Sequence, residues 1–163
     1  MPETVNEHAV TLRRATAEDA PVLASHRAAI RREHARWDAA TIDVAIPVWQ
    51  RYFRRTIADE TYVAYIAERD REVVGSGALL IHHAVPRPGS DAELDARMHS
   101  VYVVPDCRRR GIGRAIVDAL LGYARARPVL RVVLHPSEEA RPLYASFGFE
   151  PSEEMVLAIT GLH

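Results

Sequence analysis

Short runs of apolar residues, alternating with polar ones or continuous, predict the strands of this chain. The run over 61–68 and the run over 73–83 are separated by the polar residues 69–71, which is typical of a turn between paired strands. Proline, glycine and serine gather over 85–91, which makes that segment the most loop-like of the chain. The predicted strands are Val10–Arg14, Thr61–Glu68, Val73–His83, Leu94–Val104, Val129–Leu134 and Met155–Ile159.

Apolar residues at spacings of three and four predict helices between these strands. Thr16 followed by Glu18 and Asp19 is typical of a helix start, because a hydroxyl can cap the first turn and acidic side chains favour it. The predicted helices are Ala17–His34, Thr41–Ala58, Gly111–Arg127 and Ser137–Ser146. The resulting order, β-α-α-β-β-β-α-β-α-β, indicates an α/β protein whose mixed sheet has helices on both faces. The order lacks the strict βαβ alternation of a doubly wound dinucleotide-binding fold.

Length and charge limit the class of protein. The 163 residues suffice for one core, so we expect a single domain over 10–163 after a flexible segment over 1–9. The net charge of -1 gives no general attraction to nucleic acid or to anionic membranes, and neither is expected as a partner. No apolar run approaches the ~20 residues of a membrane-spanning helix, and the chain does not start like a signal peptide. These features favour a soluble, cytoplasmic protein.

Lysine and cysteine usage excludes several chemistries. All 21 basic residues are arginine, so mechanisms that need a lysine nucleophile or a Schiff base are excluded. The single cysteine, Cys107, rules out a disulfide framework and a cysteine-based zinc cage. His82, His83 and His99 are too scattered in the sequence to indicate a metal site, so we expect no metal.

A turn rich in arginine and glycine, 108–114, separates the strand that ends before Pro105 from the helix that follows. Backbone N–H groups at such a helix N-terminus can bind phosphate. A P-loop is excluded because it needs a lysine after its second glycine. A Rossmann fingerprint fails because Ile116 stands where a small residue is needed. Taken alone, the turn is also compatible with a helix entry whose arginines only aid solubility.

The turn from Arg108 to Gly113 fits the pattern Arg/Gln-x-x-Gly-x-Gly/Ala, and it resembles the acetyl-CoA motif of the GCN5-related N-acetyltransferases (the GNAT family). The resemblance covers 10–159 in the order of elements and 101–149 in specific residues. It implies the GNAT fold and a coenzyme A site in which 109–114 cradle the pyrophosphate, while the backbones of Val101 and Val103 pair with the pantetheine arm. The cofactor-binding residues so implied are Val101, Val103, Arg108, Arg109, Arg110, Gly111, Ile112, Gly113, Arg114, Ser137 and Tyr144.

A second stretch, 135–149, resembles the family's C-terminal motif. The resemblance makes Tyr144 the general acid for the CoA thiolate, and a phenol of pKa about 10 is suitably matched to a thiol of about 8.5–10. Ser137 stands where many members have Asn; it can cap a helix and offers a hydroxyl to the pantetheine. Outside such a motif, a tyrosine on a helix face would more often only pack.

The attacking amine arrives protonated, so a base or a water relay must accept a proton. Val132 stands where some family members place a Glu base, so that base is absent. The remaining candidates are His135, which topology places nearest to the thioester, and five others: Glu33, His34, His82, His83 and His99. Each also has a purely structural explanation, and the sequence singles out none. Four aromatic residues of the predicted helical pair could line the acceptor groove or belong to the core: Trp37, Trp49, Tyr52 and Phe53.

The sequence therefore predicts direct transfer of an acetyl group from acetyl-CoA, the cosubstrate, to the amine of a small molecule or peptide. Two other interpretations stay open: a non-catalytic acyl-CoA sensor on the same fold, and a transferase with a different acyl group or an oxygen or sulfur acceptor. The acceptor is not identified. A homodimer, which is common in the family, is one expected oligomeric state.

Overall fold

The computed structural model describes residues 9–34 and 36–159 and has a five-stranded sheet at its centre. The strands are β1 (Thr11–Arg14), β2 (Tyr62–Arg69), β3 (Glu72–His83), β4 (Leu94–Val103) and β5 (Val129–Val133), in that order across the sheet. The helices are α1 (Ala20–Glu33), α2 (Ala39–Ala58), α3 (Ile112–Arg125) and α4 (Arg141–Ala145), with short 3-10 turns η1 (Ala17–Asp19) and η2 (Pro105–Cys107). Apart from Ala9, the segment 1–9 that was predicted to be flexible lies outside the described residues.

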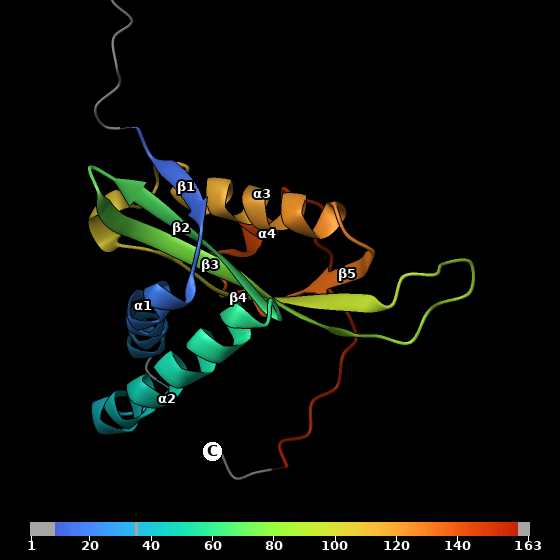
Figure 1. Ribbon diagram of the computed structural model, residues 1–163, viewed down its shortest axis with the longest axis horizontal. Helices are drawn as coiled ribbons and strands as arrows, with labels where there is room; N and C mark the ends of the chain where they lie inside the picture. The colour runs from blue at the N-terminus through green and yellow to red at the C-terminus, as the bar shows by residue number, and fades with distance from the viewer. Residues whose placement is uncertain (1–8, 35, 160–163) are drawn as a thin grey trace, which may run out of the picture.

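The sheet is the middle of three layers, with helices on both faces as predicted (Figure 1). On one face α3 packs against the sheet through the fully buried Ile116, Val117 and Leu120. On the other face α1 and α2 pack together over a second core that contains Phe53 and Ile66. Burial of the apolar face of each helix thus fixes α1 and α3 on opposite sides of the same strands.

Two glycines in β3 allow α3 and β4 to approach this strand closely. A Cβ on Gly77 would lie 2.7 Å from Cγ2 of Ile116, and one on Gly75 would lie 2.8 Å from the carbonyl oxygen of Tyr102. Both distances are shorter than a real side chain tolerates, so any larger residue would push its neighbour away. The position of α3, and with it that of its N-terminus, therefore depends on glycine at these places.

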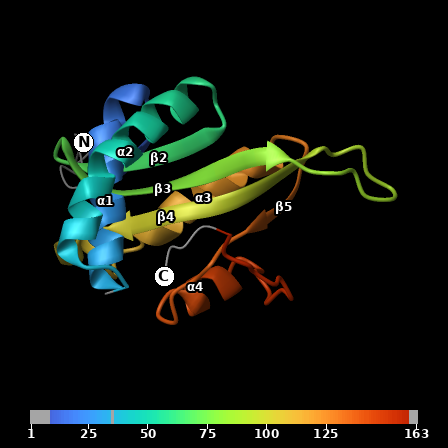
Figure 2. The same cartoon turned by 90° about the horizontal axis from the view of Figure 1, so that it is seen from below.

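The sheet opens between β4 and β5. These strands are parallel and pair only at the start of β4, where Arg97 and Val133 are the last partners. Beyond Arg97, β4 stays paired with β3 on one side, and no strand of the described residues lies on the other. Figure 2 shows β5 and α4 lying apart from the C-terminal end of β4. The pairing of β3 with β4 shifts register opposite 76–78, and Ser100 has a φ of 53°, so a bulge marks the point where the edge becomes free.

The two elements nearest the C-terminus differ from the prediction. Residues 155–159 form no strand, and the side chains of Met155 and Val156 are 98% and 91% exposed. A continuous run of apolar residues carries strand propensity, but a strand forms only with a partner, and no described strand pairs with this segment. Helix α4 begins at Arg141 instead of Ser137, because Pro142 occupies its first turn, where proline is favoured, and 138–140 form a separate turn.

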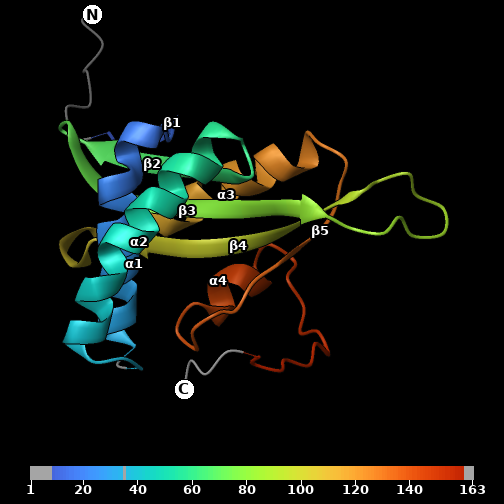
Figure 3. The ribbon, with the colours of Figure 1, turned by 60° about the horizontal axis from the view of Figure 1, so that its bottom comes forward.

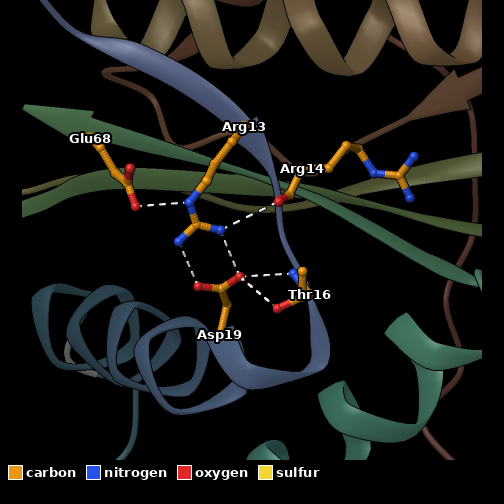
Figure 4. Close-up of polar contacts among 5 residues, drawn as sticks. All are labelled: Arg13, Arg14, Thr16, Asp19 and Glu68. Atoms are coloured by element: carbon orange, nitrogen blue, oxygen red, sulfur yellow. Dashed lines mark hydrogen bonds and ion pairs between the residues drawn. The ribbon is translucent and has the colours of Figure 1, made fainter. Parts of the chain in front are cut away.

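Arg13 connects the first strand to the start of α1 (Figure 4). Its guanidinium makes two hydrogen bonds of 2.8 Å to the carboxylate of Asp19 and one of 2.8 Å to Glu68 on β2. The same Asp19 carboxylate accepts the backbone N–H of Thr16 at 2.8 Å, so the predicted helix start is held by a carboxylate. This network fixes where α1 leaves the sheet, and α1 is one wall of the cleft described below.

The guanidinium of Arg13 lowers the pKa of Asp19 below its ordinary 3.8. A lowered pKa stabilises the fold above about pH 3.8, and the contribution is lost as pH falls through the folded-state pKa. We expect Asp19→Asn to cost about 1 kcal/mol at neutral pH, because the Arg13 side chain is 41% exposed and water screens the pair. Urea unfolding should show this difference at pH 7 and its disappearance in acid. Glu18→Gln, an equal change of charge at an exposed neighbour, should have little effect at either pH.

Candidate active site

An open cleft of about 620 Å³ lies where the sheet opens. Its walls come from the end of α1, the C-terminal half of β4, the turn before α3, the first residues of α3, and the segment from Ser137 to Tyr144. Figure 3 shows α1 beside the C-terminal end of β4, and α4 on the side of the strand from which β5 has diverged. The two motifs that the sequence pointed to, 108–114 and 135–149, therefore meet at one cleft.

The turn before α3 leaves the helix N-terminus without a cap. Gly111 is the residue before the helix, and its φ of 82° is a left-handed conformation that glycine adopts without strain. Ala115 donates the first helical hydrogen bond, to the carbonyl of Gly111 at 3.0 Å. The preceding N–H groups of Ile112, Gly113 and Arg114 have no acceptor within the described part of the chain. All three residues line the cleft, so their N–H groups and the helix dipole can bind an anion there.

The four arginines of the turn are placed differently. The Nε of Arg108 donates to the carbonyl of Val103 at 2.8 Å, and its terminal nitrogen bonds Glu33 on α1 at 2.6 Å. Glu33 thereby raises the pKa of Arg108. Arg114 stacks on Phe147 and donates to Ser146 at 2.6 Å, which ties α3 to α4. Arg109 and Arg110 are exposed and have no polar partner among residues 9–34 and 36–159, so their charges are free for an anionic ligand.

The strand wall of the cleft is the free edge of β4. Val101 and Val103 both line the cleft, in the half of β4 that has no β5 partner. An extended ligand can therefore lie beside this edge in the position of a missing strand. The carbonyl of Val103 is already an acceptor for Arg108.

Tyr144 lies on the opposite wall, in α4. Its side chain is 9% exposed, it packs edge-on against Phe149, and it lines the cleft. No described residue hydrogen-bonds its hydroxyl, and burial raises the pKa of the phenol. Ser137 also lines the cleft, and its hydroxyl accepts the N–H of Ala140 at 3.3 Å, which closes the turn before α4.

The candidate bases are not all brought together: His34 is exposed and lines the cleft beside Glu33, whereas His82 is exposed on β3. Glu33 lines the cleft but is held by Arg108, and His83 is exposed at the far end of β3. His135 is exposed after β5 and is not among the residues that line the cleft. His99 is half-buried on β4, and burial, with the nearby charges of Arg27, Arg97 and Arg31, lowers its pKa to about 4.

A buried histidine behind the cleft was missed by the sequence analysis. His26 on α1 shares a 2.7 Å hydrogen bond with Ser76 on β3, and its ring lies 4.9 Å from that of Tyr102 on β4. The same Tyr102 ring is also contacted by Arg108, whose guanidinium lies 5.4 Å from the ring centre. Burial lowers the pKa of His26 to about 4, so it is neutral at pH 7 and acts by packing. The spacing of three and four residues between Leu23, His26 and Ile30 indicates a buried helix face. It does not show which residues the His26 side chain contacts.

Three of the four aromatic residues proposed for the acceptor groove lie in the core or pack against it: Phe53, Tyr52 and Trp49. Phe53 is 3% exposed, and Tyr52 packs against it and Tyr62. Trp49 and Trp37 also lie against arginines of α1, at 5.2 Å from Arg27 and 4.7 Å from Arg31. No group of three or more metal-ligating side chains is found within the described ranges, and none of the helices there is long and apolar enough to cross a membrane.

Comparison with known families gives a match over most of the chain. The model of the acetyltransferase (GNAT) family matches residues 27–149. The chain is 30% identical over 84 residues to glucosamine 6-phosphate N-acetyltransferase of Trypanosoma brucei brucei, covering 52% of this chain and 55% of that protein. It is 40% identical over 83 residues to mycothiol acetyltransferase of Beutenbergia cavernae, and this match covers 47% of this chain and 26% of that protein. The chain thus spans between a quarter and just over half of these relatives.

Solved structures agree over nearly the whole fold. A GCN5-related N-acetyltransferase from Ralstonia eutropha superposes with a TM-score of 0.85 and 27% identity, over 94% of this chain and 100% of that one. An acetyltransferase of Clostridium acetobutylicum, solved with acetyl-CoA, gives a TM-score of 0.82 at 23% identity, over 92% and 96% of the two chains. At this lower identity, the match to the Clostridium structure shows a shared fold only.

Proposed function

Because this chain belongs to the acetyltransferase (GNAT) family, we propose that it transfers an acetyl group from acetyl-CoA to the nitrogen of an amine. The observation that carries the proposal is the cleft itself. It combines an uncapped helix N-terminus, a free strand edge and a tyrosine hydroxyl that no described residue hydrogen-bonds. These are respectively suited to a pyrophosphate, an extended pantetheine arm and a leaving thiolate.

The pyrophosphate of acetyl-CoA would bind at the start of α3. The N–H groups of Ile112, Gly113 and Arg114 supply hydrogen bonds, and the free guanidinium groups of Arg109 and Arg110 supply charge. Arg108 has another role, because it is engaged with Val103 and Glu33; it braces the turn against β4 and α1. The pantetheine would then run along Val101 and past Ser137 toward Tyr144.

In the reaction the amine nitrogen attacks the thioester carbonyl, a C–N bond forms, and the C–S bond breaks. The thiolate that leaves would take the proton of the Tyr144 hydroxyl, and solvent would return a proton to the phenolate. Because burial raises the pKa of Tyr144, the phenol stays protonated throughout the neutral range. The amine proton would leave through water or to His34, which lines the cleft; Glu33, the other candidate there, is held by Arg108, and burial lowers the pKa of His99.

The acceptor does not follow from the relatives. Their names specify glucosamine 6-phosphate for one, mycothiol for another, and N-alpha acetylation for a third, from Mycobacterium tuberculosis. Since each match covers only part of the relative, none of these acceptors is assigned to this chain. A homodimer and a cytoplasmic location remain predictions from the sequence.

The proposal is tested by incubating the protein with acetyl-CoA and a broad panel of primary amines, alcohols and thiols. We expect one free CoA thiol and one N-acetylated acceptor per turnover, measured with a thiol reagent and by mass spectrometry. Tight binding of acetyl-CoA without turnover on any acceptor would favour the sensor function instead. Acetylation of alcohols or thiols alone would replace the amine by another acceptor class.

A further inference from the structure

Two arginines on α1 converge on the bulge of β4 beside the cleft. The guanidinium of Arg27 donates to the hydroxyl of Ser100 at 3.1 Å and stacks on Trp49. One turn further along α1, Arg31 stacks on Trp37. Both side chains are half-buried, and burial lowers the pKa of each guanidinium. The positive charges of Arg27 and Arg31 also act on His99, the residue before Ser100.

Neither arginine has a carboxylate partner among residues 9–34 and 36–159, and burial distinguishes the pair from exposed arginines that also lack one, such as Arg109 and Arg110. Five others each hold an Asp or Glu carboxylate at 2.6 to 2.9 Å: Arg13, Arg32, Arg108, Arg131 and Arg141. Removing a guanidinium from water without a counter-charge is costly, and two neighbouring ones also repel each other. Stacking on Trp49 and Trp37 fixes the arginines in place but leaves most of their N–H donors unused.

The arginine pair lies next to residues that line the cleft, although neither arginine lines the cleft itself. Along α1, Ile30 and His34 line the cleft, and positions 27, 31 and 34 fall on one side of the helix at spacings of three and four. Along β4, Ser100 directly precedes Val101, which lines the cleft. An acceptor bound at the end of the pantetheine arm would therefore have one end at the thioester. Its other end would lie within reach of the N–H donors of Arg27 and Arg31.

We propose that the acceptor is an amine that also carries an anionic oxygen group, a carboxylate or a phosphate, and that Arg27 and Arg31 bind this group. The inference rests on the proposed acetyltransferase function and names its substrate class. A carboxylate or phosphate oxygen pair matches the planar guanidinium donors and supplies the counter-charge that the protein does not. Bound in this way, the anion would hold the amine at the other end of the acceptor toward the bulge and the thioester.

The test measures acceptor binding and acceptor turnover with matched compounds. Amino acids are compared with their carboxamides, and aminoalkyl phosphates with the parent amino alcohols. Dissociation constants are measured by calorimetry with CoA present, so that no transfer occurs, and kcat/KM is measured with acetyl-CoA. We expect the anionic member of at least one pair to bind at least tenfold more tightly. The amino acid series tests recognition of a carboxylate, and the aminoalkyl phosphate series tests recognition of a phosphate.

Three single variants assign this preference to residues. Arg27→Gln and Arg31→Gln should each reduce the preference for the anionic compound at least tenfold, while thermal melting confirms that the variant is folded. Arg32→Gln is the matched control, since it lies on the same helix and its guanidinium already holds Asp43 at 2.6 Å; its preference should equal that of the wild type. If Arg27→Gln fails to fold, Arg31→Gln decides.

The inference and the proposed function can fail separately. Acetylation of neutral amines as efficient as that of anionic ones, or an anionic preference that survives both substitutions, would overturn the inference and leave the acetyltransferase function intact. Anionic compounds that bind through Arg27 and Arg31 without any being acetylated would support the anion site while contradicting the proposed function.

Discussion

Replacing Tyr144 with Phe should lower kcat about 100-fold and leave the affinity for acetyl-CoA nearly unchanged. The substitution removes one oxygen from a side chain that is 9% exposed and whose hydroxyl no described residue bonds, so packing and the walls of the cleft are retained. Only the donor for the departing thiolate is lost. The measurement is steady-state release of CoA thiol, together with calorimetric binding of acetyl-CoA.

Tyr123→Phe is the matched control for this prediction. Tyr123 is also 9% exposed, lies in α3 and contacts the guanidinium groups of Arg14 and Arg127 outside the cleft. It should keep the wild-type kcat. Because burial raises the pKa of Tyr144 from its ordinary 10.0, any fall in kcat caused by loss of its proton should occur above pH 10. An unchanged kcat in Tyr144→Phe would remove this residue from the mechanism.

Replacing Gly111 with Val should weaken acetyl-CoA binding about 10- to 100-fold while the fold survives. Gly111 has a φ of 82°, where a β-branched residue is strained by about 1–3 kcal/mol. No atom lies within 4 Å of a Cβ built at this position, so the cost is one of backbone conformation. The turn would relax toward negative φ and carry the N–H groups of 112–114 away from the pyrophosphate. Calorimetry with acetyl-CoA measures the loss.

Gly122→Ala provides the comparison within the same helix. Gly122 is an exposed residue inside α3, and a Cβ there meets no atom within 4 Å. Alanine is a better helix former than glycine, so this variant should gain about 0.5–1 kcal/mol in stability and bind acetyl-CoA as the wild type does. Wild-type binding by Gly111→Val would show that the pyrophosphate lies elsewhere.

The elements that could be predicted from the sequence are those determined by local periodicity. In α3 the predicted apolar positions Ile112, Ile116 and Leu120 are all buried, because one helix face packs on one sheet. The segment 155–159 has an equally clear apolar pattern but no strand beside it, and strand formation depends on that partner. Such pairing is a tertiary property, which the apolar pattern along the chain cannot specify.

The candidate site shows the same division between local and tertiary signals. A helix that starts after the glycine-rich turn with exposed N–H groups was predicted, since the spacing of glycines is a local signal; the left-handed conformation of Gly111 was not. That Arg108 turns toward Glu33, 75 positions away, was not, because the guanidinium reaches a residue distant in the chain. For the same reason the sequence could not distinguish Arg27, which lacks a carboxylate, from the other arginines around it.

A structure of the chain with bound CoA tests the account most directly. The account predicts the pyrophosphate at the N–H groups of Ile112, Gly113 and Arg114, the pantetheine beside Val101, and the sulfur within hydrogen-bonding distance of the Tyr144 hydroxyl. A pyrophosphate bound away from the start of α3, or a sulfur remote from Tyr144, would contradict it.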